Sequence, residues 1–241
     1  MANDAQLMRP RGARRGETTK QTILDAAERC LAEGDFDGVS LRTITDAAKV
    51  DLALVNYHFG SKENLVREVI ARRARILHEA RVLALEEARS EAGTISPSVE
   101  AIVTAFLEPF LTRLASGDPG WQCYNRVICQ LSMMPKYLPL ASSVLDPTAL
   151  HFINALRAAL PNASAKSVFW GYMFLLGAMI QVMASTGRVE KLSRGLCRTD
   201  DIESVLREIV PFVTGGLCAL NAPPAGSADR GGGSNDPDRP V

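Results

Sequence analysis

The chain has 241 residues, enough for one large domain or for a small domain joined to a larger one. Apolar residues make up 46% of it and charged residues 22%, which excludes a wholly disordered chain and fits a globular protein with a sizeable core. The formal net charge is zero, so any binding to a polyanion must come from a local patch.

The five cysteines argue against a disulfide framework or a cysteine metal site. They are Cys30, Cys123, Cys129, Cys197 and Cys218, an odd number with no C-x2-C pair. The first residues also lack the apolar run of a signal peptide. We therefore expect a reducing, cytoplasmic location, with no metal and no cofactor.

Both ends of the chain read as disordered. Residues 1–16 hold four arginines among proline and glycine, which predicts a mobile basic arm. Residues 221–241 are rich in Pro, Gly, Ser and Asp and cannot support a core.

Everything between the ends reads as helix, so the predicted fold class is all-α. An apolar stripe that includes Ile23 and Leu31 predicts a first helix over 18–33. Ser40 is placed to cap a short second helix, Asp51 a third over 52–58, and Ser61 a long fourth helix reaching 90. Further helices are expected at about 97–116, 120–132, 136–159, 164–186 and 200–220.

The uncharged run 168–184 covers 17 residues, slightly fewer than the ~18–20 that a spanning helix needs. We interpret it as a buried or interface helix and expect no contact with a membrane.

Three short helices within residues 17–62, the last two joined by a tight turn, predict a helix-turn-helix DNA-binding domain. Small residues at 47 and 48 suit the close crossing of two short helices. The outer face of the third helix then carries Leu52, Ala53, Asn56 and Tyr57, which fit a major groove. Thr43, Tyr57, His58 and Lys62 flank it as donors for phosphate oxygens.

The stretch "ILDAAERCLAEGDFDGVSLRTITDAAKVDLALVNYHFGSKENL" resembles the TetR family of bacterial transcriptional repressors. "VNYHFGSK", with "NRVICQ" and "GRVEKLSRGL" further on, is similar to the fatty-acid-responsive PsrA-like subgroup. Two positions depart from the family pattern: Lys49 stands where a turn glycine is usual, tolerable if its φ is negative, and Asn56 replaces a frequent aromatic residue.

The resemblance implies DNA contacts from Arg42, Thr43, Leu52, Ala53, Asn56, Tyr57, His58 and Lys62. Asn56 is the best candidate for base readout, because an amide pairs bidentately with adenine. The resemblance also implies that residues 63–220 form a ligand-binding and dimerisation domain whose last two helices pair with those of a second copy. Two recognition helices would then meet a palindromic operator, and a fatty acid or acyl-CoA would release it.

The second domain offers an apolar ligand site lined by aromatic and methionine side chains. The candidates are Phe106, Phe110, Trp121, Met133, Phe152, Trp170 and Phe174, with Arg126 as a possible partner for a ligand's acidic group. A surface position for Arg126 and simple core filling by the others are the alternatives. The arginines at 67, 72, 73 and 75 fit a solvated helix face better than a DNA contact.

Two rival functions remain open. One is a transcriptional activator or a DNA-binding protein without an effector. The other is a helical enzyme that uses His58 or His151, which would need polar groups converging on a histidine. The sequence shows no such cluster, so no catalytic residue is assigned.

Overall fold

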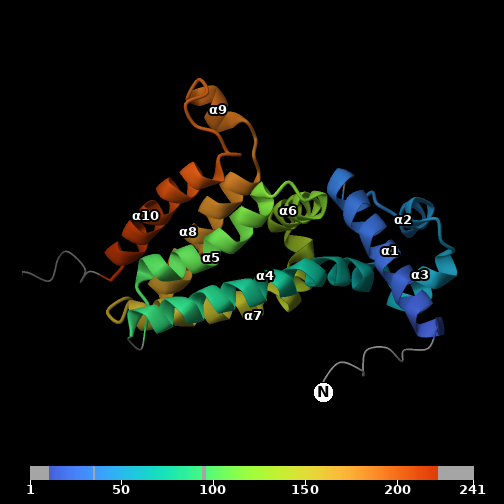
Figure 1. Ribbon diagram of the computed structural model, residues 1–241, viewed down its shortest axis with the longest axis horizontal. Helices are drawn as coiled ribbons and strands as arrows, with labels where there is room; N and C mark the ends of the chain where they lie inside the picture. Colours follow the sequence, from blue (N-terminus) through green and yellow to red (C-terminus); the bar gives the residue numbers. More distant parts are fainter. Residues whose placement is uncertain (1–10, 35, 94–95, 222–241) are drawn as a thin grey trace, which may run out of the picture.

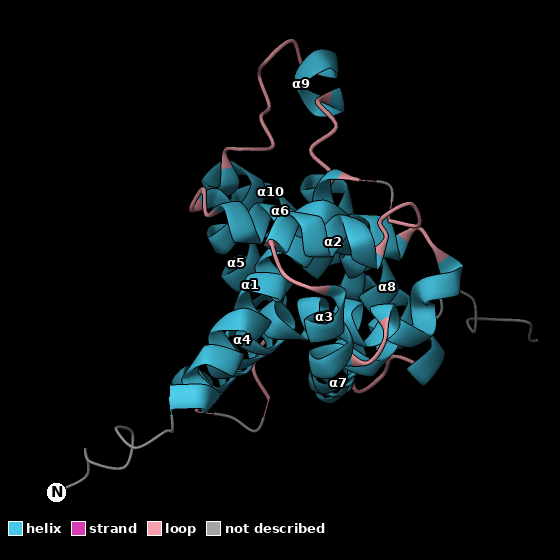
Figure 2. Ribbon diagram, turned by 90° about the vertical axis from the view of Figure 1, so that its right-hand side faces the viewer, coloured by secondary structure: helices cyan, strands magenta, loops and turns pink. Residues whose placement is uncertain are grey.

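The computed structural model describes residues 11–34, 36–93 and 96–221, and within these ranges every regular element is helical, as predicted (Figures 1 and 2). The proposed arm is described only from residue 11, and the tail 222–241 lies outside the described residues. The elements are α1 (Arg11–Glu33), α2 (Leu41–Ala48), α3 (Leu52–Phe59), α4 (Lys62–Ala92), α5 (Val99–Ala115), α6 (Pro119–Ser132), a 3-10 turn η1 (Pro135–Tyr137), α7 (Leu138–Ala159), α8 (Ala165–Met183), α9 (Arg188–Leu192) and α10 (Ile202–Ala219).

Helices α1, α2 and α3 form a small bundle at one end of the molecule, in blue in Figure 1. Its core contains Ile23, Ile44, Val55 and Phe59, all buried. Helix α1 begins at Arg11, earlier than the predicted Thr18, so helix continues into the segment expected to be a mobile arm.

Three predicted caps start the next three helices. The side chain of Ser40 accepts a hydrogen bond from the Thr43 backbone N–H, and Ser61 does the same for Asn64. Asp51 accepts from the backbone N–H of Ala53 at 2.7 Å. Each bond satisfies an N–H that the first helical turn leaves without a partner, so the caps fix where α2, α3 and α4 begin.

Helix α4 extends for 31 residues from the small bundle to the far end of the second domain (Figure 1). Buried residues along one side, among them Leu65, Val69, Leu77 and Leu85, pack it first against α1 and then against α5 and α7. One continuous helix thus belongs to the cores of both domains.

The second domain packs α5, α6, α7, α8 and α10 around one core, with α5 lying against both α4 and α10. Gly171 permits the close approach of α8 to α10, because a Cβ there would lie 2.6 Å from a Leu217 methyl carbon. Apart from the early start of α1, the ends of the predicted helices coincide with the observed ones or differ by a few residues, as is usual for helix boundaries.

The short α9 was not predicted. It stands away from the body of the domain on two loops, as both views show (Figures 1 and 2). Its apolar side chains Val189 and Leu192, and Leu196 just after it, are exposed.

Helix α8 is the one helix in the described ranges that is long and apolar enough to cross a membrane by length and composition, and a third of that stretch is buried inside the protein. The helix packs against α10, α7 and α6. We therefore interpret it as part of the domain core with one face left open.

Candidate DNA-binding surface and effector cavity

The outer face of α3 is open to solvent. Leu52, Ala53, Asn56 and Tyr57 are all exposed, and Tyr57 keeps 81% of its surface accessible. On the opposite side Val55 and Phe59 anchor the helix in the core. This division matches the prediction and leaves a narrow cylinder of modest side chains directed away from the protein.

The other predicted DNA contacts lie on α2, at the end of α3 and at the start of α4. Arg42 and Thr43 are exposed on the first turn of α2, where Thr43 Oγ1 lies 2.9 Å from Ser40 Oγ. His58 is half-buried, with its ring 5.1 Å from that of Tyr57, and Lys62 is the first residue of α4. Among the described residues, no group of three or more His, Cys, Asp or Glu side chains could hold a metal ion.

Lys49, in the turn between α2 and α3, corrects one expectation. A lysine there is tolerable with a negative φ, yet Lys49 adopts φ 55 and ψ 46, the left-handed region. Its N–H still closes the helix by donating to the Asp46 carbonyl at 3.3 Å. A side chain in this conformation costs about 1 kcal/mol relative to glycine, so the turn carries local strain.

The second domain contains a cavity of about 1130 Å³ between α4, α5, α6, α7 and α8. Most of its lining is apolar. Of the predicted ligand residues, Phe106, Phe110, Met133 and Trp170 line it. Met133 and Trp170 are exposed, so the cavity reaches the surface on their side.

Four predicted ligand residues lie elsewhere. Arg126 is exposed on α6 and does not line the cavity, so the inward orientation is not observed. Phe152 is fully buried in the core, where its ring meets that of Phe106 at 5.1 Å. Phe174 points outward and stacks on Trp170, while Trp121 is held between two arginines, as described below.

Arg81 is a charged lining residue that was not predicted from the sequence. It is 7% exposed, and its Nε donates to the Phe106 carbonyl at 2.7 Å. Burial lowers the pKa of Arg81 to about 10, so the side chain stays cationic at neutral pH. The available signal was its position four residues from both Leu77 and Leu85, on the buried stripe of α4.

Two tyrosines add buried polar groups to the lining. Tyr124 and Tyr172 are buried, and desolvation raises the pKa of each to about 12. Their hydroxyl groups are therefore neutral at neutral pH and able to donate hydrogen bonds.

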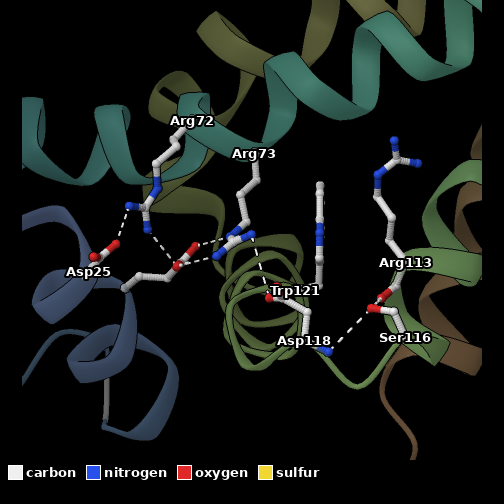
Figure 3. Close-up of polar contacts among 8 residues, drawn as sticks. Asp25, Arg72, Arg73, Arg113, Ser116, Asp118 and Trp121 are labelled. Carbon is white, nitrogen blue, oxygen red and sulfur yellow. Dashed lines mark hydrogen bonds and ion pairs between the residues drawn. The ribbon is translucent and has the colours of Figure 1, made fainter. Parts of the chain in front are cut away.

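An ion-pair cluster joins α1 to α4 and α6, close to the cavity. The Glu28 carboxylate, 3% exposed, accepts from Arg72 Nη2 at 2.6 Å and from Arg73 Nε at 2.6 Å. Arg72 also reaches Asp25, and Arg73 approaches Asp118 at the start of α6 (Figure 3). Arg72 and Arg73, two of the four arginines expected on a solvated face, are thus partly buried and form ion pairs that join helices.

Trp121 connects this cluster to the cavity wall. The Arg73 guanidinium lies 5.1 Å from its ring centre and that of Arg113 5.6 Å, and the close-up shows the indole between them (Figure 3). The same ring meets Tyr124 at 5.7 Å and Phe110 at 6.3 Å, and both of these line the cavity. A chain of contacts therefore runs from the cavity to α1.

Two family profiles match the chain, one over the DNA-facing bundle and the start of α4 and the other over most of the second domain. One, described as bacterial regulatory proteins of the tetR family, covers residues 23–69, and the other, a tetracyclin repressor-like C-terminal domain, covers residues 104–216. The chain belongs to the TetR family. It is thus a transcriptional regulator by family, with the helix-turn-helix and the helical second domain that its structure displays.

Curated relatives match about a quarter of this TetR-family chain. The transcriptional repressor AcnR of Corynebacterium glutamicum is 37% identical over 65 residues, which is 25% of this chain and 35% of the relative. AcnR of Corynebacterium efficiens is 35% identical over the same length. The match therefore spans about a third of the length of these relatives.

Solved structures share the fold over most of the chain. Salmonella enterica GusR superposes with a TM-score of 0.54 at 20% identity, covering 88% of this chain and 99% of its own. The fatty acid degradation regulator FadR from Bacillus halodurans gives 0.53 at 16% identity, over 83% and 96%. The multidrug binding protein EbrR, complexed with malachite green, gives 0.54 at 21% identity, over 80% and 96%. These likenesses establish the fold, and the PsrA-like subgroup stays a prediction.

Proposed function

We propose that this TetR-family protein is a ligand-responsive repressor that binds a palindromic operator as a homodimer and leaves it when a small hydrophobic effector fills the cavity. The observation that carries the proposal is the position of α4. One end of this helix packs against the DNA-facing bundle, and its middle forms a wall of the apolar cavity. A change in the cavity thus has a direct mechanical route to the recognition helices.

For DNA binding, α3 enters the major groove with its exposed face. Asn56 reads a base edge, while Arg42, Thr43, Tyr57, His58 and Lys62 bind phosphates or support that contact, and Leu52 and Ala53 give the helix its narrow apolar front. The AcnR relatives named above are repressors, which supports repression rather than activation here.

The homodimer forms through α8 and α10. These helices leave a large apolar surface uncovered on the isolated chain, including Phe174 on α8 and Phe212 on α10, the latter 77% exposed. Monomeric proteins rarely expose such patches, and an isologous contact would bury the surface of both copies. Leu192 on α9 and Leu196 just after it are also exposed, so apolar side chains are uncovered beyond α8 and α10 as well.

The effector acts by shifting the population of two forms of the dimer. A ligand that favours the form with misplaced recognition helices needs about 1–3 kcal/mol of coupling to lower operator occupancy noticeably. The cluster of Glu28, Arg72 and Arg73 carries the displacement of α4 to α1. The resemblance to the PsrA-like subgroup suggests a fatty acid or an acyl-CoA.

The two rival functions fit less well. The alternative of a DNA-binding protein without an effector assigns no role to the apolar cavity of about 1130 Å³ in the second domain. For an enzyme, His151 and His78 lie with ring centres 6.5 Å apart, and His78 Nδ1 bonds to Thr148 Oγ1. The ion pairs of the described residues include neither histidine, so no carboxylate orients either ring as a catalytic base. We infer a regulator that acts on nucleoid DNA in the cytoplasm.

The proposal is tested by selecting genomic DNA fragments on the purified full-length protein and repeating the selection with candidate hydrophobic ligands. We expect a short palindromic sequence to be enriched and to be released by one ligand class. Tyr57→Ala serves as a control that abolishes enrichment while the fold is kept. Enrichment that no ligand changes would favour the effector-free alternative.

A further inference from the structure

The cavity holds one buried positive charge that no carboxylate neutralises. Within the described ranges, the ion pairs of the protein do not include Arg81. Its partners are the Phe106 carbonyl, the Met179 sulfur at 3.6 Å from Nη2, and the Phe106 ring at 3.8 Å. Burying an unpaired charge is costly, so such groups normally pair with an opposite charge.

The observed contacts of Arg81 leave binding capacity unused. A guanidinium has five N–H donors, and these contacts engage two of them, one with a thioether that accepts weakly. The carbonyl bond fixes the side chain through Nε, while the residue itself forms part of the cavity wall. A planar fork held in place beside a cavity is suited to a bidentate anion.

The other ionisable residues of the wall do not supply a buried counter-charge. Asp146 and Lys166 line the cavity too, but both side chains are exposed. Tyr124 and Tyr172 are buried beside Arg81 and remain neutral donors at neutral pH. The buried ionisable groups of the wall are therefore one cation and two neutral phenol hydroxyl groups, and apolar side chains form most of the lining.

We propose that Arg81 is the anchor for the acidic group of the effector, which is an amphipathic organic anion with an apolar body, typically a free carboxylic acid. The acid enters head first, and its body fills the space toward Met133 and Trp170 at the exposed side. This orientation excludes a coenzyme A thioester, because the thioester has no acidic group at that end of the chain. The inference rests on the proposed function of the cavity as the effector site.

The test compares three probes of equal chain length by isothermal titration calorimetry on the full-length protein: decanoate, decanol and decanoyl-coenzyme A. We expect decanoate to bind the wild-type protein at least about tenfold more tightly than either of the others, the size of one charged hydrogen-bonding contact. Decanol or the thioester binding as tightly as decanoate would overturn the assignment, as would no binding of decanoate.

Two variants assign the preference to a residue. Arg81→Met keeps an unbranched side chain, shorter than that of arginine, and removes the charge, so it should bind decanol as before and lose the preference for decanoate. Arg126→Met, which removes an exposed arginine outside the cavity, should keep the preference. Preference retained in the first variant or lost in the second would overturn the role of Arg81. If Arg81→Met does not fold, the three-probe comparison on the wild-type protein decides alone.

Operator release is measured separately on the same samples. Decanoate that binds through Arg81 without releasing the operator would contradict the proposed function and leave the ligand assignment standing. Release of the operator by decanol or the thioester, with no preference for the acid, would support the proposed function and contradict the ligand assignment.

Discussion

Glu28 and Arg73 join α1 to α4 through two parallel hydrogen bonds, Nε to Oε1 at 2.6 Å and Nη2 to Oε2 at 3.0 Å. The carboxylate is buried and its partner partly so, which makes this pair stronger and more exacting in geometry than a surface ion pair. It lies where the DNA-facing bundle meets the second domain.

Replacing Glu28 by Gln should lower the free energy of unfolding by roughly 3 kcal/mol, because two arginines lose the charge that compensates their burial. Urea denaturation followed by circular dichroism measures the change. The matched control is Glu86→Gln, which removes an exposed pair with Arg89 and should cost at most about 0.5 kcal/mol. Equal effects of the two substitutions would contradict the structural role of Glu28.

Replacing Gly120 by Ala should disturb the same pair from the side of α6. A Cβ at this position would lie 1.5 Å from Arg73 Nη2, so the guanidinium must leave its place beside Glu28. We expect a loss of stability in the wild-type protein and almost none in an Arg73→Ala background, where the obstruction is gone. Additive effects in this double-mutant cycle would argue against the predicted displacement.

Replacing Lys49 by Gly should stabilise the protein by about 1 kcal/mol, because glycine adopts φ 55 without steric cost. The measurement is the shift in the thermal midpoint. Lys49→Ala is the matched control, since it removes the same charge but keeps the strained conformation, and it should bring no gain. A similar gain from both variants would assign the effect to charge rather than to the backbone.

Replacing Asn56 by Ala should weaken operator binding by about 1–3 kcal/mol and relax the preference at one base pair, with little change in stability because the side chain is exposed. Fluorescence anisotropy on operator variants reads both effects. Asn154→Ala, an exposed asparagine on α7, should leave the affinity unchanged. A uniform loss across all operator variants would instead indicate a backbone contact.

Replacing Phe212 by Glu should convert the protein to a monomer, because a charge would enter the centre of the proposed α8–α10 interface. Sedimentation velocity measures the oligomeric state. Leu83→Glu changes an exposed leucine on α4 and should remain dimeric. A dimer that persists in the Phe212 variant would place the interface elsewhere.

Local chemistry explains which parts of the fold were predictable from sequence. Ser40, Asp51 and Ser61 bond to backbone N–H groups two or three residues ahead, so their caps depend on neighbours that the sequence displays directly. The exposed face of α3 followed for the same reason, from the spacing of Val55 and Phe59.

Contacts between distant segments were not predictable in this way. Arg81 is buried because Phe106 on α5 and Met179 on α8 contact its side chain, whereas Arg126 on α6 is exposed, and these contacts join segments far apart in sequence. Glu28 lies 45 positions from Arg73 in sequence, so no local pattern marked the pair. The left-handed conformation of Lys49 was hidden because the usual glycine is absent.

The uninterrupted length of α4 has a geometric consequence for the proposed dimer. At about 1.5 Å per residue, Arg81 lies about 28 Å along the helix from Lys62. Rotation of this rod by about 5° at the ligand end would swing its other end by about 2.5 Å. In a symmetric pair both ends swing, so the two recognition helices would fall about 5 Å out of step with grooves that repeat every ~34 Å. A ligand that contacts no residue of α3 would thereby prevent α3 from fitting into the DNA groove.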